Sequence, residues 1–553
     1  MKAPHSIDIT PDQIERLLER IEAQNLESED YPLLGILIRM LVWLNLELKE
    51  KKASVERLRR VFGIKTESAK KLLDFAKIQE DTEEQGENSE EQDQQNNDKA
   101  KKKNKGHGHR GAKDYLNAKI VDIAHQTLKA GDRCPECLKG SLYRLKPGSI
   151  VRIVGQPWLQ VHVYAPERLR CNSCGAVFTA RLPKEIASGS RADKTAKTVV
   201  ALLKYRGGFP FYRQEQLQTM LGTPISDTEL WEMTRDVADS LEFIHQALLS
   251  EAAKGKCLHN DDTKAKILSV MKENEKIKAK DKKARVGIFT TAILSKIEGG
   301  KQIALYFTGT QHAGENLNDV LKERPPDLKA PIQMCDALSS NKPQDHKTFE
   351  GNCLAHARRK FFEIVAFWPE NILQVIVWFD EIFRNDRKAK KQSLSDKERL
   401  SWHKKYSAPL MSKIKSWCKG LQKNKQAEPN SSFGKAIAYL QNHWKEFTLF
   451  LRMKGVPLSN NADERLIKRA VLNRKNGYFF KTLEGARIGD IILSVVETCG
   501  LNGVNPLDYM VAVQSHEQDV RDKPHSWLPW NYQIRLSELQ SSQEIAPAMT
   551  VSC

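Results

Sequence analysis

The sequence predicts a multidomain protein of the α+β class, and three features of its 553 residues lead to this prediction. The N-terminal region and a later stretch, residues 364 to 455, show apolar residues at helical spacing. Between them, residues 256 to 340 contain short strand-like apolar runs separated by turns. Two Cys-x-x-Cys pairs indicate a small metal-binding segment. A chain of this length accommodates roughly three or four domains.

The charge balance predicts a polyanionic partner. Lys and Arg number 88 against 70 Asp and Glu, which gives a net charge of +18. Nucleic acid is the leading candidate, an acidic membrane surface is the second, and a basic protein without such a partner is the third. No run approaches the ~20 apolar residues of a membrane helix, and MKAPHSIDITPDQ has no apolar signal core. We therefore expect a cytoplasmic protein without a membrane partner.

Residues 1–78 are predicted to form a helical region with a helix-turn-helix. Thr10 is a suitable N-cap for a first helix, and SVERLRRVFGIKTESAKKLLDFA indicates two helices joined at Gly63. Such a pair either contacts DNA or only packs together. Residues 79–112 contain an acidic block followed by a basic block and almost no apolar residues, so a disordered charged linker is expected.

Residues 113–190 are predicted to form a zinc-binding segment. CPEC and CNSC provide four thiolates, which suit a closed tetrahedral site for structural Zn²⁺. The 33 residues between the pairs include strand-like runs that would form a zinc-ribbon-like sheet. The ligands would be Cys134, Cys137, Cys171 and Cys174.

Residues 191–250 are predicted to be helical and to contain a second helix-turn-helix. One helix ends near Gly222 and the next begins at Ser226, where Glu229 completes a capping box. The sequence leaves open which of the two helix pairs contacts DNA.

Residues 251–515 are predicted to form the catalytic domain, followed by a C-terminal tail over 516–553. The runs KCLHNDDTKAKILSV, ARVGIFTTAILS and QIALYFTGT indicate three strands, a helix is expected over 313–323, and APIQMCDALSS indicates a fourth strand. This order is that of the first half of a ribonuclease-H-like fold. The helical stretch from 364 to 455 is an insertion before the last catalytic helix.

Three carboxylates have positions that suit phosphodiester chemistry. Asp261 lies in the first strand, Asp336 lies at the end of the fourth, and Glu464 lies on a helix far downstream. Two-metal-ion cleavage needs oxygen ligands on rigid elements that hold two Mg²⁺ or Mn²⁺ ions about 3.5–4 Å apart. For each acid alone, a solvent-facing role is the alternative; their joint placement favours a metal site.

A cationic stretch follows the third acid in SNNADERLIKRAVLNRKNGYFF. Five Lys or Arg residues and no acid occur between positions 465 and 475. Cations beside a metal-binding carboxylate would hold phosphates, whereas a solvated amphipathic helix is the alternative interpretation. Asp463 is expected to point to another helical face and to be solvated.

Five segments together resemble the insertion-sequence-66 family of DDE transposases, and they occur in that family's order. They are LHNDDT, CDALSS, GNCLAHARRKFFE, SNNADERLIKRAVLNRKN and SVVETCGLNGVNPLDYM. The paired Cys-x-x-Cys segment, KYRGGFPFYRQEQL and SWLPWN are also similar to that family, so the resemblance covers roughly residues 30 to 532.

The resemblance implies a catalytic triad of Asp261, Asp336 and Glu464, which binds Mg²⁺ or Mn²⁺. Asp262 is the alternative first ligand, although it would point to the opposite face of the strand. Motif positions next to Glu464 are Asn460 and Asn461. The implied DNA-binding residues are Arg465, Lys468, Arg469, Arg474, Lys475, His356 and Arg359.

The activity implied is transposition of an insertion sequence. A 3′-hydroxyl is released by hydrolysis at each end of the element, and that hydroxyl then attacks target DNA. The resemblance also implies a homo-oligomer on DNA, small co-encoded accessory proteins, and a bacterial cytoplasmic location associated with the nucleoid. Terminal repeats and target preference are not encoded in any motif of the chain.

Three segments depart from the family's pattern. Asp336-Ala337-Leu338 stands where Asp-Gly-Tyr is usual, and Asn260 stands where a small residue is common. A Lys-rich insert also follows near 272 to 283. These departures keep an alternative open, namely a catalytically silent, zinc-containing DNA-binding protein derived from a transposase. A structure-specific nuclease without strand transfer is a further alternative.

Overall fold

The computed structural model describes residues 190–545 except 282, 283, 366 and 425. It also describes 20–21, 127–133, 135, 139–143, 158–170 and 177–183. The chain divides into two compact units. Among the described residues, 190–211 and 228–545 belong to the first, which contains the sheet, whereas 127–183 and 212–227 belong to the second.

The second unit contains a short hairpin. Strands β1 (Arg168–Arg170) and β2 (Val177–Thr179) pair antiparallel. Most of helix α7 (Phe211–Met220) also belongs to this unit. The four cysteines predicted to bind zinc lie outside the described residues, as do the predicted N-terminal helix pair and the charged linker.

The first unit contains a five-stranded mixed sheet with the strand order β5-β4-β3-β6-β7. Its strands are β3 (Cys257–Lys264), β4 (Phe289–Lys296), β5 (Gln302–Gly309), β6 (Ile332–Cys335) and β7 (Phe349–Asn352). Strands β3, β4 and β5 are antiparallel neighbours, whereas β6 is parallel to β3 and β7 is parallel to β6. Helix α10 (Ala313–Lys322) joins β5 to β6, so the predicted series of three strands, helix and strand is present.

The first predicted strand run is too long at its C-terminal end. Strand β3 ends at Lys264, and helix α9 (Leu268–Lys280) begins within the run that was expected to be extended to Val270. Ile267 is buried and pairs with Phe480 in an isolated bridge, whereas α9 buries none of its residues. In KILSV, Ile267 is therefore buried, whereas Leu268 and Val270 are partly buried in the first turn of α9.

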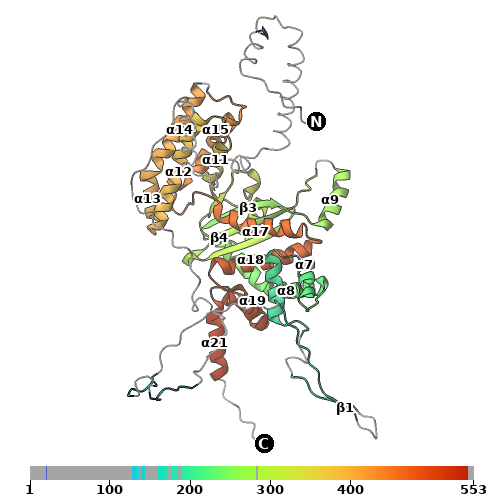
Figure 1. Ribbon diagram of the computed structural model, residues 1–553. Coiled ribbons are helices and arrows are strands. Elements are labelled where there is room, and N and C mark those ends of the chain that lie inside the picture. Colours follow the sequence, from blue (N-terminus) through green and yellow to red (C-terminus); the bar gives the residue numbers. More distant parts are fainter. Residues whose placement is uncertain are drawn as a thin grey trace. The chain divides into compact units, whose positions relative to one another are not determined.

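Helices from both sides of the sequence pack against the sheet in one core. Helix α17 (Asn461–Gly477) packs on β3 and β4, and α18 (Leu483–Leu501) packs on β5 (Figure 1). The same core includes α8 (Asp227–Ala253) and α19 (Pro506–Ser515). The remaining elements of this part are α6 (Lys194–Ala201), a π-helical turn (Leu202–Arg206), α20 (Glu517–Asp522) and α21 (Tyr532–Ile545).

Helix α18 closes the outer edge of β5 with a ladder of side chains. Every fourth residue of α18 accepts a hydrogen bond from every second backbone N–H of β5. The four rungs run from Gln302 to Asn502 (3.2 Å), Ala304 to Thr498 (3.0 Å), Tyr306 to Ser494 (2.9 Å) and Thr308 to Asp490 (2.6 Å). Four helical residues rise about 6 Å and two strand residues about 6.7 Å, so the two spacings match. Edge N–H groups that would otherwise be open are thereby paired.

The stretch between β7 and α17 is helical, as predicted for residues 364 to 455. Its helices are α11 (Leu354–Phe362), α12 (Pro369–Lys391), α13 (Asp396–Tyr406), α14 (Ala408–Lys423), α15 (Ser432–Asn442) and α16 (Trp444–Phe447). All of these helices except α13 contribute to a second apolar core, together with Ile332 and Met334 of β6. In the part of the chain that the structure describes, no helix combines the length and apolar character needed to span a bilayer.

Candidate catalytic site

The three acids singled out in the sequence come together at one end of the sheet. Asp261 lies in β3, and Asp336 directly follows β6. His259 pairs with Met334 in the parallel register of these strands, so Asp261 and Asp336 lie level with each other two residues further on. Glu464 lies in the first turn of α17, which packs on β3.

The electrostatics of these carboxyls reflect their proximity. Burial raises the pKa of Asp261 to about 7, and the charges of Asp336, Asp262 and Glu464 contribute in the same direction. Burial also raises the pKa of Asp336. A cation bound among them would offset this repulsion, because opposite charge favours the ionised forms.

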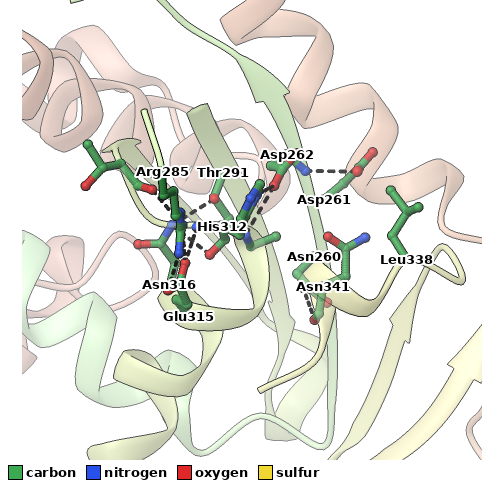
Figure 2. A network of polar contacts seen from close by, with 12 residues as sticks. Asn260, Asp261, Asp262, Arg285, Thr291, His312, Glu315, Asn316, Leu338 and Asn341 are labelled. Carbon is green, nitrogen blue, oxygen red and sulfur yellow. Dashed lines mark hydrogen bonds and ion pairs between the residues drawn. The ribbon is translucent and has the colours of Figure 1, made fainter. Parts of the chain in front are cut away.

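Asp261 and Asp262 have different surroundings. The Asp262 carboxylate lies 2.9 Å from Nδ1 of His312 and accepts a 3.4 Å hydrogen bond from the N–H of Ala313 at the start of α10 (Figure 2). The Asp261 carboxylate accepts a hydrogen bond from the N–H of Asp262 and faces the other acids. Asp262 is thus held by His312 and the start of α10, whereas Asp261 lies next to Asp336 and Glu464.

Asp463 is buried, so the expectation of a solvated acid was wrong. Its exposed fraction is 0%, and neither carboxylate oxygen has a hydrogen-bond partner among the described residues. Burial raises its pKa well above the usual value, and Asp261 and Glu464 add to the effect. The physical reason is helical spacing: Asp463 shares the buried face of α17 with Leu466, Ile467 and Ala470.

Cys353, His356 and Glu464 form a group that could hold a metal ion, with ligand atoms within 4.8 Å of one another. Nε2 of His356 lies 3.7 Å from Oε1 of Glu464. Nδ1 of His356 and Oε1 of Glu464 are both buried and have no hydrogen-bond partner in the described part of the chain. Cys353 is fully buried, and burial raises the pKa of its thiol to about 11. Cys353 was not predicted as a site residue, although its spacing of three from His356 was a signal.

A buried amide network positions the acids. Asn460, one residue before α17, lies 2.9 Å from Nδ1 of His259 through its Oδ1 and donates to the carbonyl of Asn260. Asn260 donates to the carbonyl of Asn341, and Asn341 donates to the carboxylate of Asp336. The elements that carry the three acids are therefore joined by hydrogen bonds. The sequence marked Asn460 only as a motif position and Asn260 only as a departure.

The candidate DNA-binding cations differ in their exposure. Arg465, Lys468 and Lys475 are exposed on α17. Arg469 and Arg474 are partly buried on the same helix, and Arg359 is partly buried on α11. Nε of Arg469 lies 3.5 Å from the carboxylate of Glu497, which also pairs with Arg206. Three of the five cations predicted to bind DNA on α17 are therefore exposed.

The mixed sheet and its clustered carboxyls define a protein with an acidic centre. Residues 189–488 match the family described as Transposase IS66 family, and the chain belongs to that family. Membership implies a transposition-related function with DNA as the partner.

Three uncharacterized proteins of Sinorhizobium fredii are similar to the chain. The protein y4jD is 23% identical over 420 residues, which is 72% of this chain and 78% of the relative. The protein y4hP is 24% identical over 391 residues, or 66% of this chain and 67% of the relative. The third, y4qI, is 22% identical over 369 residues, or 64% of this chain and 66% of the relative.

Proposed function

We propose that the chain is a DDE-type transposase that cuts DNA at the ends of its element and joins those ends to target DNA. The observation that carries the proposal is the convergence of Asp261, Asp336 and Glu464 from elements far apart in the sequence. The strand order β5-β4-β3-β6-β7 supports a ribonuclease-H-like catalytic domain. Transposase family membership supplies the substrate class.

The residues present fit divalent metal ions. Burial and the charges of neighbouring carboxyls raise the pKa of Asp261, and the buried Oε1 of Glu464 has no hydrogen-bond partner among the described residues. Carboxylate oxygens are the ligands that Mg²⁺ and Mn²⁺ prefer. Asp261, Asp336 and Glu464 would hold two such ions, which would activate the attacking oxygen and stabilise the leaving one.

The proposed reaction has two steps, in which the protein's residues hold the acids in place and bind the DNA. In the first step a water oxygen forms a bond to the phosphorus at the element end, and the bond from phosphorus to the 3′-oxygen breaks. In the second step the freed 3′-hydroxyl attacks a target phosphorus and displaces a target 3′-oxygen. The amide network through Asn460 fixes the acids in place for both steps. Arg465, Lys468 and Lys475 would bind the DNA backbone along α17.

Further parts of the proposal concern assembly and the zinc segment. We propose structural Zn²⁺ at the four paired cysteines and a homo-oligomer that holds two DNA ends. Small accessory proteins encoded with the element would assist. These proposals rest on the residue patterns and on family membership.

The test is cleavage and joining of labelled DNA that carries the element's own ends. Purified full-length protein is incubated with Mg²⁺ or Mn²⁺, beside Glu464→Gln and the control Glu232→Gln, whose side chain is exposed on α8. Accessory proteins are supplied. We expect metal-dependent 3′ cleavage and joined products from the wild type and the control, but not from Glu464→Gln. Thermal melting with and without metal reports binding independently of activity.

Each other outcome has a definite meaning. Tight DNA binding without cleavage would favour the catalytically silent derivative, to which the Asp336-Ala337-Leu338 departure points. Cleavage without joined products would favour a structure-specific nuclease. Full activity of Glu464→Gln would refute the proposed triad.

A further inference from the structure

The loop after α17 presents two aromatic side chains to solvent. Tyr478 and Phe479 are adjacent, and their exposed fractions are 64% and 50%. Large aromatic side chains usually contribute to a core or an interface, so two neighbouring exposed rings need an explanation. The catalytic proposal makes no use of them.

The loop is held in a strained conformation. Tyr478 has φ 64° and ψ −45°, and the N–H of Phe479 donates to the carbonyl of Gly477 at 2.8 Å, which is a classic γ-turn. Strain of this kind persists only where the surroundings impose it, and it often accompanies function. Here Phe480 anchors the loop: its N–H donates to Lys266, its carbonyl accepts from Leu268, and its ring packs against the core.

Four cations are among the residues that line a cavity beside the loop. Lys204, Lys264, Lys266 and Arg474 line it together with Tyr478 and Phe479. Nε of Arg474 is buried and has no hydrogen-bond acceptor among the described residues. Asp490 also borders the cavity, but its carboxylate is bound by Thr308. An anion in this cavity would supply the missing acceptor for Arg474.

Lys204 adds a buried positive charge to this cavity. Its Nζ lies 5.3 Å from the centre of the Phe211 ring, and burial lowers its pKa to about 8. No neighbouring carboxylate contributes to this pKa shift. A bound phosphate would stabilise the charged form of this lysine.

The distance from the acids to this loop can be estimated along two elements, β3 and α17. Along β3 and its extension, Lys264 and Lys266 follow Asp261 by three and five residues, or about 10–17 Å. Along α17, Gly477 follows Glu464 by thirteen residues, or about 20 Å. At about 3.4 Å per nucleotide step, the loop lies about three to six nucleotides from the candidate catalytic centre.

We infer that Tyr478 and Phe479 form a stacking platform for an unpaired nucleobase of the element-end DNA, with Lys264, Lys266 and Arg474 binding the adjacent phosphates. The inference rests on the proposed function and names a contact that the triad does not provide. Bases inside a duplex are covered by their neighbours, so exposed rings can stack only on bases that have left the helix. The surrounding cations favour DNA over a second copy of this cationic protein.

The first experiment measures binding by fluorescence anisotropy with the full-length protein. The probes are a 20-nucleotide oligothymidylate and a fully paired duplex of unrelated sequence. The variants are the double substitution Tyr478→Ala with Phe479→Ala, the same pair changed to Trp, and Ile534→Ala. Ile534 is 65% exposed on α21 and serves as the matched control for loss of exposed apolar surface.

We expect the Ala double variant to bind oligothymidylate at least tenfold more weakly and the duplex less than threefold more weakly. The Trp pair should retain binding, and Ile534→Ala should change it less than twofold. Equal weakening for both probes, or none, would overturn the inference. Thermal melting confirms that each variant is folded, and the Trp pair gives the same test without loss of ring surface.

A second readout locates the base. 2-Aminopurine is placed in turn at the first six positions beside the cleavage site of a duplex of the element end. The wild type should change the emission at one position, and the Ala double variant should not. Cleavage without any such position would refute the stacking contact while leaving the proposed function intact. Absence of all DNA binding by the wild type would refute both.

Discussion

The Asp490 carboxyl of α18 gives a quantitative test of how the helix holds the sheet edge. Its two oxygens accept hydrogen bonds from the N–H and the hydroxyl of Thr308 at 2.6 and 2.7 Å. Burial raises its pKa from 3.8 to about 7. In the unfolded chain the group ionises near its ordinary pKa, whereas the folded protein keeps the proton to higher pH.

The sign of the pH dependence follows from this difference. The contribution of Asp490 to the free energy of unfolding is fully present below about pH 4 and is lost as the pH rises to about 7. A shift of about three pKa units at 1.36 kcal/mol each corresponds to about 4 kcal/mol. Between pH 5 and 7 the loss is about 2 kcal/mol on the same basis, because the folded group is still half protonated at pH 7.

Asp490→Asn removes this dependence while keeping the shape of the side chain. The amide oxygen can still accept from the Thr308 N–H, and the Thr308 hydroxyl has Thr290, 2.9 Å away, as another partner. We expect urea unfolding from pH 5 to 8 to show the variant gaining up to about 3 kcal/mol relative to the wild type. Asp239→Asn, at an exposed position on α8, is the control and should follow the wild type. Parallel pH profiles for wild type and Asp490→Asn would refute the reasoning.

Two further predictions concern the candidate site. Asn460→Ala removes both hydrogen bonds of the side chain, so the buried ring of His259 loses its partner at Nδ1. We expect the free energy of unfolding, measured in urea, to fall by about 2–4 kcal/mol. An unchanged midpoint would contradict a positioning role for this amide. Zn²⁺ should inhibit Mg²⁺-dependent cleavage, because the Cys353 sulfur lies near Glu464 and suits a softer ion. Cys353→Ser should need at least tenfold more Zn²⁺ for half-inhibition; equal sensitivity would exclude Cys353 as a ligand.

Four strands of the sheet were predictable because each is a short apolar run bounded by turn residues, whereas β7 (Phe349–Asn352) was not predicted, because its sequence FEGN contains one apolar side chain. The runs around Asp261, Thr291 and Tyr306 correspond to β3, β4 and β5. The end of β3 was not predictable from periodicity, because Ile267 is buried through a bridge to Phe480, far along the chain. Long-range pairing of this kind leaves no local pattern.

The three acids of the candidate site were predictable, but the buried residues and hydrogen bonds around them were not. Asp261 and Asp336 follow apolar runs, which is a local signal, and Glu464 was marked by its motif. The burial of Asp463 was missed because its charge suggested solvent, although its spacing from Leu466 placed it on the apolar stripe of α17. Hydrogen bonds such as Asn460 to Asn260 join residues 200 apart, and nothing local encodes them.

The ladder between α18 and β5 also affects how the chain folds during its synthesis on the ribosome. Its partners are separated by 200 residues at one end and 182 at the other. At about 5–20 residues per second, a ribosome finishes β5 roughly 10–40 s before it completes α18. During that interval the N–H groups of β5 are open to any other strand, including that of a neighbouring nascent chain. Copies of the element that end before α18 should therefore yield protein that aggregates rather than a smaller folded fragment.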